Sequence, residues 1–70
     1  METVRNILEK YRDKPFDVII FSDDNFVHFD CRDLSKFDLD GVAKTSYDHE
    51  VLEMLVKSWY LDAKEIRILV

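Results

Sequence analysis

The sequence predicts an α+β fold in which an N-terminal helix packs on a small, mostly antiparallel sheet of about four strands. Two patterns predict this fold. The chain opens with an apolar stripe of helical spacing, and runs of β-branched and aromatic residues follow, separated by polar turn residues. Because the chain has 70 residues, we expect a single domain, 1–70, near the lower size limit of a self-supporting core. An alternative fold has two helices on three strands.

Residues 3–12 are predicted to form the helix. The apolar residues of this segment recur at positions i, i+3, i+4 and i+7, and they are Val4, Ile7, Leu8 and Tyr11. Thr3 can cap the first turn with its hydroxyl group. Pro15 ends the helix, because the residue before a proline is disfavoured in the α region.

Residues 16–22 and 26–31 are predicted to form a β-hairpin, since both runs are rich in β-branched and aromatic residues. The residues between them, Ser22 to Asn25, hydrogen-bond readily to local backbone and tolerate a positive φ. Residues 32–46 are less regular. We expect a loop there, with a helical turn and an optional short edge strand.

Residues 48–61 fit two patterns. A helix would place Val51, Leu52, Leu55 and Trp59 opposite a polar stripe, whereas a strand would place Leu52, Met54, Val56 and Tyr60 on one face. We favour the strand, because Val56 and Tyr60 would face solvent on a helix. It would turn at residues 61–65 into a final strand, 66–70.

Composition and charge indicate a cellular setting. A single cysteine cannot form an internal disulfide, and no apolar run is long enough to cross a bilayer. We therefore expect a cytoplasmic protein. The net charge of −5 disfavours direct binding to nucleic acid or to anionic membranes.

The excess negative charge lies entirely within residues 17–48. This stretch holds eight aspartates against three bases, and the rest of the chain is neutral. Such segregation favours a partner with a basic protein surface, and it predicts the partner-binding residues Asp23, Asp24, Asp38 and Asp40. The alternative is turn chemistry, because aspartate side chains satisfy loop backbone.

A metal site is the second hypothesis. Its candidate ligands, all competent to bind zinc, are His28, Asp30, Cys31 and His49. On a regular strand His28 and Asp30 share a face while Cys31 points to the opposite one, so the site needs a bulge or a strand end. Otherwise Cys31 is a core residue and both histidines are surface residues. We expect no cofactor, with a structural zinc ion as the alternative.

The chain carries no catalytic motif. One glycine cannot build a phosphate-binding loop, and no motif marks a serine as a nucleophile, so we do not expect an enzyme. Trp59 is expected in the core. For Tyr60 and Tyr47 the sequence favours neither the core nor the surface. A third hypothesis is a housekeeping interaction domain that forms dimers through residues 66–70 as an edge strand.

Four segments of the chain are similar in style to short accessory proteins encoded by phages and mobile elements of Gram-positive bacteria. They cover residues 4–11, 16–20, 56–61 and 65–70. In size, charge and α+β make-up the chain resembles small acidic anti-CRISPR inhibitors of type II effectors. That group shares no common motif, so no functional residue carries over. The resemblance implies a stoichiometric inhibitor that binds a basic face of a Cas9-type effector in a bacterial host cell.

Overall fold

The computed structural model describes residues 2–36 and 46–70, and the side chains of residues 36 and 46–49 lie outside the description. The elements, in chain order, are α1 (Val4–Lys10), β1 (Asp17–Phe21), β2 (Val27–Cys31), the 3-10 helix η1 (Leu34–Lys36), α2 (Ser46–Glu53), β3 (Ser58–Asp62) and β4 (Glu65–Leu69). The α+β fold with an N-terminal helix and a mostly antiparallel sheet is therefore confirmed. No helix in this part of the chain is long and apolar enough to span a membrane.

The four strands form one sheet in the order β2-β1-β4-β3. The two outer pairs are antiparallel, and the central pair of β1 with β4 is parallel. The expectation that residues 66–70 form an edge strand is therefore wrong, because β4 lies between β1 and β3. Ile66 and Ile68 on this strand are fully buried, which suits a central position in the sheet.

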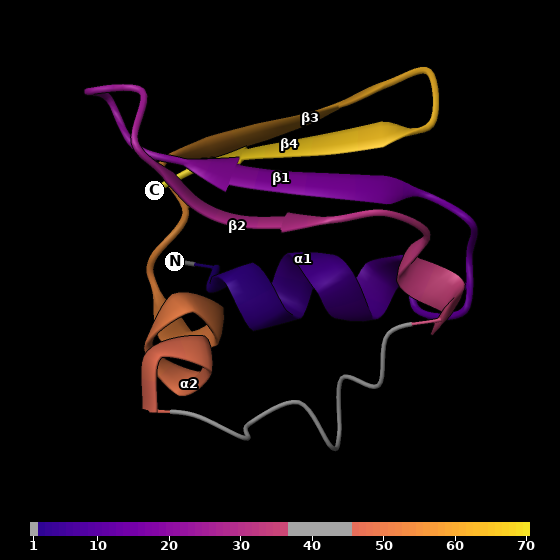
Figure 1. Ribbon diagram of the computed structural model, residues 1–70, viewed down its shortest axis with the longest axis horizontal. Helices are drawn as coiled ribbons and strands as arrows, with labels where there is room; N and C mark the ends of the chain where they lie inside the picture. Colours follow the sequence, from indigo (N-terminus) through magenta and orange to yellow (C-terminus); the bar gives the residue numbers. More distant parts are fainter. Residues whose placement is uncertain (1, 37–45) are drawn as a thin grey trace.

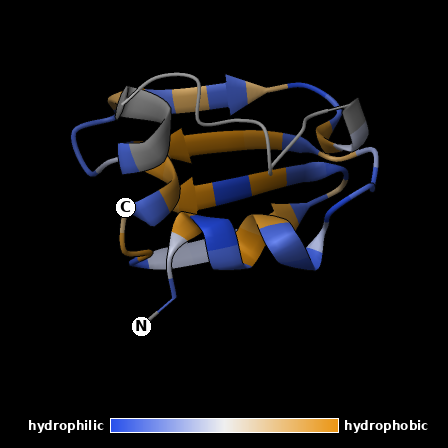
Figure 2. Cartoon of the chain, turned by 90° about the horizontal axis from the view of Figure 1, so that it is seen from below, coloured by the Kyte–Doolittle hydropathy of each residue, from blue (hydrophilic) through white to orange (hydrophobic). Residues whose placement is uncertain are grey.

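The helices cover one face of the sheet, and the core lies between the two layers (Figure 1). Seen from the helix side, the two central strands, β1 and β4, carry most of the hydrophobic colour (Figure 2). The buried residues are Val4, Ile7, Leu8, Val18, Ile20, Leu34, Val51, Leu52, Ile66 and Ile68. The predicted helix supplies three of these residues, so its apolar stripe is confirmed as the face that packs on the sheet.

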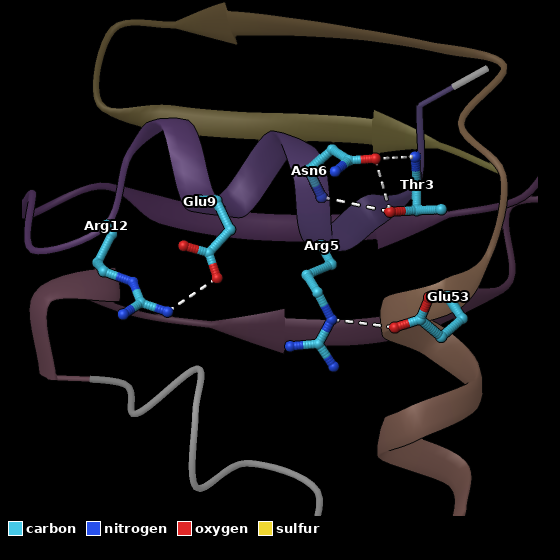
Figure 3. A network of polar contacts seen from close by, with 6 residues as sticks. All are labelled: Thr3, Arg5, Asn6, Glu9, Arg12 and Glu53. Atoms are coloured by element: carbon cyan, nitrogen blue, oxygen red, sulfur yellow. Dashed lines mark hydrogen bonds and ion pairs between the residues drawn. The ribbon is translucent and has the colours of Figure 1, made fainter.

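Thr3 caps α1 as predicted. Its hydroxyl accepts a hydrogen bond from the Asn6 backbone N–H, and the Asn6 side chain accepts one from the Thr3 N–H in return (Figure 3). The helix ends at Lys10, two residues before the predicted end. Asp13 then has a φ of 66°, so the chain has left the helical path before Pro15 is reached.

Residues 48–61 combine both readings. The preference for a strand is wrong for the first part, which belongs to α2, and right for the end, which forms β3. Val51 and Leu52 are buried, as the helical reading requires. The link after α2 lies beside the start of α1: the Val4 N–H donates to the Met54 carbonyl at 3.0 Å. This hydrogen bond joins segments about fifty residues apart, so no local sequence pattern predicts it. It holds the chain in an extended conformation directly after α2 ends at Glu53.

The predicted β1–β2 hairpin is confirmed, with one irregularity. Asn25 in its turn has a φ of 64°, within the left-handed region that asparagine tolerates. The pairing register shifts between Ile20 and Phe21, so Phe29 pairs with Ile20 but Val27 pairs with Phe21. This bulge moves Val27 to the face of Phe21, away from the helices.

Candidate protein-binding surface

The face of the sheet that the described helices leave uncovered is the candidate functional surface (Figure 1). Side chains alternate along each strand, so the neighbours of the buried isoleucines and valines point to this face. We call it the open face. Its residues are Asp17, Ile19 and Phe21 of β1, Val27 and Asp30 of β2, Ser58, Tyr60 and Asp62 of β3, and Glu65, Arg67 and Leu69 of β4.

Three carboxylates form a row across one end of the open face. Asp17 pairs with Glu65 on the neighbouring strand, and Glu65 pairs with Asp62 on the next. We call these three residues the acidic row. Like charges directly opposite each other on a sheet are destabilising, so the arrangement has an energetic cost. A sheet that carries this cost on an uncovered face is suited to meet positive charge from outside.

Two members of the acidic row have internal partners. Asp17 accepts a hydrogen bond from the Asp33 backbone N–H at 3.0 Å, and Glu65 lies 3.0 Å from the Arg67 guanidinium. The Asp62 side chain makes no hydrogen bond or ion pair with the residues that the structure describes. Its carboxylate is exposed and available to a partner.

Asp30 extends the negative charge onto the neighbouring strand. It pairs with Ile19, one step along the sheet from the acidic row. Asp17, Asp30 and Glu65 line a hollow of about 250 Å³ with Arg32 at its border. Like Asp62, Asp30 is exposed, and its side chain has no hydrogen bond or ion pair within the described residues.

The other end of the open face is apolar and aromatic. A second hollow of about 360 Å³ is lined by Ile19, Phe21, Asn25, Val27, Tyr60 and Arg67. Val27 and Tyr60 are 47% and 51% exposed, so both residues are accessible to a partner. Aromatic and arginine residues beside apolar ones are typical of binding hot spots.

Arg67 is the fixed cation at the centre of the open face. Its guanidinium lies 5.9 Å from the Phe21 ring centroid and donates a long hydrogen bond of 3.5 Å to the Tyr60 hydroxyl. The Tyr60 hydroxyl and the Glu65 carboxylate raise the pKa of Arg67 further above its ordinary value. Arg67 therefore remains charged and links the acidic row to the apolar end.

The predicted partner-binding residue Asp23 lies at the tip of the β1–β2 hairpin, beyond the apolar end of the open face (Figure 1). Its carboxylate forms an ion pair of 2.7 Å with Lys57, and both side chains are more than half exposed. Asp23 is thus accessible, but its charge already has a partner. Its contribution to binding stays a prediction.

Asp24 behaves as the alternative hypothesis expects, because its side chain hydrogen-bonds to the local turn. Its Oδ1 accepts hydrogen bonds from the Ser22 hydroxyl at 2.5 Å and from the Phe26 backbone N–H at 3.2 Å. These bonds, the Ser22 bond most, lower the pKa of Asp24 below its ordinary value. The predicted residues Asp38 and Asp40 lie outside the described residues, and so does the Asp48 side chain.

The candidate zinc ligands are not brought together within the described residues. Cys31 pairs with Val18 and contacts the core, while Asp30 beside it faces the open side, as the alternation predicts. The His49 side chain lies outside the description, and the His28 ring contacts the Phe26 ring at a centroid distance of 4.9 Å. No group of three metal-binding side chains occurs in residues 2–36 and 46–70 as described.

The surroundings of Cys31 also affect the protonation of its thiol. Partial burial, followed by the charges of Asp17, Asp30 and Asp33, raises the pKa of its thiol above the ordinary value. The thiol therefore stays protonated at neutral pH in the metal-free chain. Zinc binding by these residues stays a prediction without structural support.

The aromatic residues divide between the layers. Trp59 packs against the core as expected, in edge contact with Tyr11 at 5.8 Å and with the Lys10 ammonium 5.3 Å from its ring. Tyr60 points to the open face, one residue further along the same strand. The side chain of Tyr47, the third aromatic considered at this point, lies outside the description.

Sequence reasoning missed Asp62 and Glu65, because both lie outside residues 17–48. Each belongs to a neutral part of the chain, and only the strand register sets them beside Asp17. Asp17 in the first predicted strand and two acids in the turn predicted at 61–65 were a usable signal once a strand order was assumed. Comparison with family models, with curated proteins and with solved structures found no match.

Proposed function

We propose that this chain is a stoichiometric protein-binding inhibitor that uses the open face to engage a basic surface of its partner. The acidic row is the observation that carries the proposal. The three carboxylates lie on adjacent strands and repel one another, Arg67 offsets part of this repulsion through Glu65, and a basic partner would offset more of it, above all at Asp62. The apolar end beside them supplies area that can be desolvated in the same contact.

The proposal assigns separate roles to the two ends of the open face. The acidic row and Asp30 steer the partner and set its register, since charged groups act mostly on association rate and specificity. Phe21, Val27 and Tyr60 form the central contact, because hot spots are concentrated in apolar and aromatic pockets. Arg67 lies between the acidic row and the apolar end, and its guanidinium supplies hydrogen-bond donors to the contact.

Nucleic acid is the partner that this surface disfavours. Aromatic side chains and an arginine on an uncovered sheet are typical of single-strand binding. Here the acidic row and Asp30 repel a phosphate backbone, which dominates such affinity. A protein that itself handles nucleic acid has the basic surface that these carboxylates require. A Cas9-type effector in the bacterial cytoplasm, implied by the resemblance above, is the specific partner we propose.

A binding and inhibition experiment tests this function. Guide-loaded Cas9-type effectors from Gram-positive hosts are titrated with the chain, with a single-stranded oligonucleotide as the negative probe. We expect an equimolar complex, loss of DNA cleavage at equimolar inhibitor, and affinity that falls as salt is added. Binding to the oligonucleotide alone contradicts the assigned partner class. Salt-insensitive binding to the effector contradicts the role of the carboxylates.

A further inference from the structure

The outer edge of β3 is the surface on which the second inference rests. β3 pairs with β4 through five consecutive residues without a bulge, and no other described strand lies on its outer side. Native sheets protect such edges with lysine, proline or bulges. Ser58–Asp62 contains no lysine, proline or bulge, and its one charge is Asp62 at the end of the strand, whereas the opposite edge strand β2 has a bulge between Val27 and Phe29.

The β3 edge exposes apolar side chains on both faces of the sheet. Tyr60 on the open face is 51% exposed, and Leu61 on the helix side is 42% exposed. Leu61 pairs with Ile66 on β4. Ile66 is fully buried under the helices, whereas Leu61 at the edge of the sheet is partly exposed. A strand added beside β3 would cover Tyr60 and Leu61 at once.

We infer that a second copy of this chain pairs with β3, antiparallel and two-fold symmetric about Tyr60. In this register Tyr60 lies opposite Tyr60, and Trp59 lies opposite Leu61 of the second copy. Asp62, the only charged residue of the strand, lies opposite Ser58, so no like charges meet. The strand is thus self-complementary, as a two-fold interface requires.

The dimer would extend the sheet from four strands to eight. Because residues that oppose one another across an antiparallel pair share a face, both helix layers would lie on one side. The two open faces would then lie side by side on the other. Pairing through a single short strand buries little area, so we expect a weak, concentration-dependent dimer. The interface shares Tyr60 with the surface of the proposed function, but it rests on the unpaired edge of β3 and not on that function.

Light scattering and sedimentation of the isolated chain across a wide range of concentration test the dimer. The variant Leu61→Lys places a charge on the pairing edge, and Val27→Lys places the same charge at a similarly exposed site on the opposite edge strand. We expect Leu61→Lys to weaken the dimer about tenfold or more, and Val27→Lys to leave it unchanged. A chain that stays monomeric throughout, or a dimer lost only in Val27→Lys, overturns the inference.

A cysteine cross-link tests the register without depending on affinity. In a Cys31→Ser background, Tyr60→Cys sets two thiols directly opposite, at a Cα separation of about 4.5–5.5 Å that a disulfide accepts. The control Ser58→Cys sets its two thiols four residues out of register, about 13 Å apart. We expect oxidation to cross-link Tyr60→Cys and to leave Ser58→Cys uncoupled. Equal cross-linking of both, or of neither, overturns the register.

Discussion

Lys57 Nζ lies 2.7 Å from Asp23 Oδ2, and this ion pair joins the start of β3 to the tip of the β1–β2 hairpin. Asp23 lies in the loop that joins the central strand β1 to the edge strand β2, and Lys57 directly precedes β3 at the opposite edge. The backbone of Lys57 is also held to the sheet, because its N–H donates a hydrogen bond of 2.8 Å to the Leu69 carbonyl at the end of β4. An aspartate singled out for partner binding therefore also has a role in holding the hairpin tip.

The first prediction concerns this ion pair. Asp23→Asn should lower the free energy of unfolding by less than about 1 kcal/mol, because both side chains are exposed to solvent. Added salt should reduce the difference further. Urea unfolding measures it, with Lys57→Gln and the double variant completing the cycle. A double variant that costs as much as both single variants together contradicts a direct interaction.

The second prediction is a pH dependence at Asp24. The pKa of Asp24 is lowered in the folded state, mainly by the hydrogen bond from Ser22, from an ordinary value of 3.8. A lowered pKa gives stability that is present above the unfolded value and lost as pH falls through the folded value. The advantage of the native chain over Asp24→Asn should therefore be constant above pH 3.8 and shrink below it. A difference that does not change with pH contradicts the assignment.

The third prediction concerns the reactivity of Cys31. Its pKa is raised above an ordinary value of 9.0 by burial and by nearby aspartates, so the thiol stays protonated at neutral pH. Labelling by a thiol reagent should be much slower in the folded chain than in urea, because the thiolate is the nucleophile. The pH midpoint of the labelling rate should lie above 9.0. Fast labelling of the folded chain at neutral pH contradicts this placement.

The fourth prediction separates the central strand from the surface. Ile68 on β4 is fully buried, whereas Leu55 is 52% exposed. Ile68→Ala should cost about 2–5 kcal/mol, a large part of the stability of a domain of this size, and Leu55→Ala should cost less than about 1 kcal/mol. Thermal unfolding followed by circular dichroism measures both. Equal costs would contradict the central placement of β4.

The fifth prediction concerns the cap of α1. Thr3→Ala removes the acceptor for the Asn6 N–H and should lower stability by about 1 kcal/mol. Thr3→Ser keeps the hydroxyl and is the matched control. Urea unfolding of the three chains gives the comparison. A loss in Thr3→Ser as large as in Thr3→Ala would mean that the methyl group matters more than the cap.

Local patterns were sufficient for some of these elements. The stripe of Val4, Ile7 and Leu8 and the cap at Thr3 depend on residues within one or two helical turns. The turn of the β1–β2 hairpin depends on a local hydrogen bond, in which the Asp24 side chain accepts from the Phe26 backbone N–H. Such features are encoded within a few residues, so sequence reasoning could find them.

Other features depend on contacts between distant segments. The change from α2 to extended chain follows from hydrogen bonds between residues 54–56 and residues 2–4. The central position of β4 follows from its parallel pairing with β1, nearly fifty residues earlier in the chain. The acidic row needs both the strand order and the register, so a count of charge along the chain pointed to residues 17–48 and missed Asp62 and Glu65.

The central claim is that the carboxylates of the open face bind the partner. Asp30→Lys and Asp62→Lys test it best, because both residues are exposed and neither holds another described side chain in place. Glu50→Lys is the matched control, since Glu50 is an exposed acid on α2 in the helix layer. All three variants should unfold at temperatures close to that of the native chain.

The decisive measurement is the affinity of these variants for the guide-loaded Cas9-type effector at low salt. We predict that Asp30→Lys and Asp62→Lys each weaken binding about tenfold or more, because each places a like charge against a basic surface. Glu50→Lys should change the affinity by less than about twofold, since it lies outside the contact. Unchanged affinity in the open-face variants, or an equal loss in Glu50→Lys, would contradict the account.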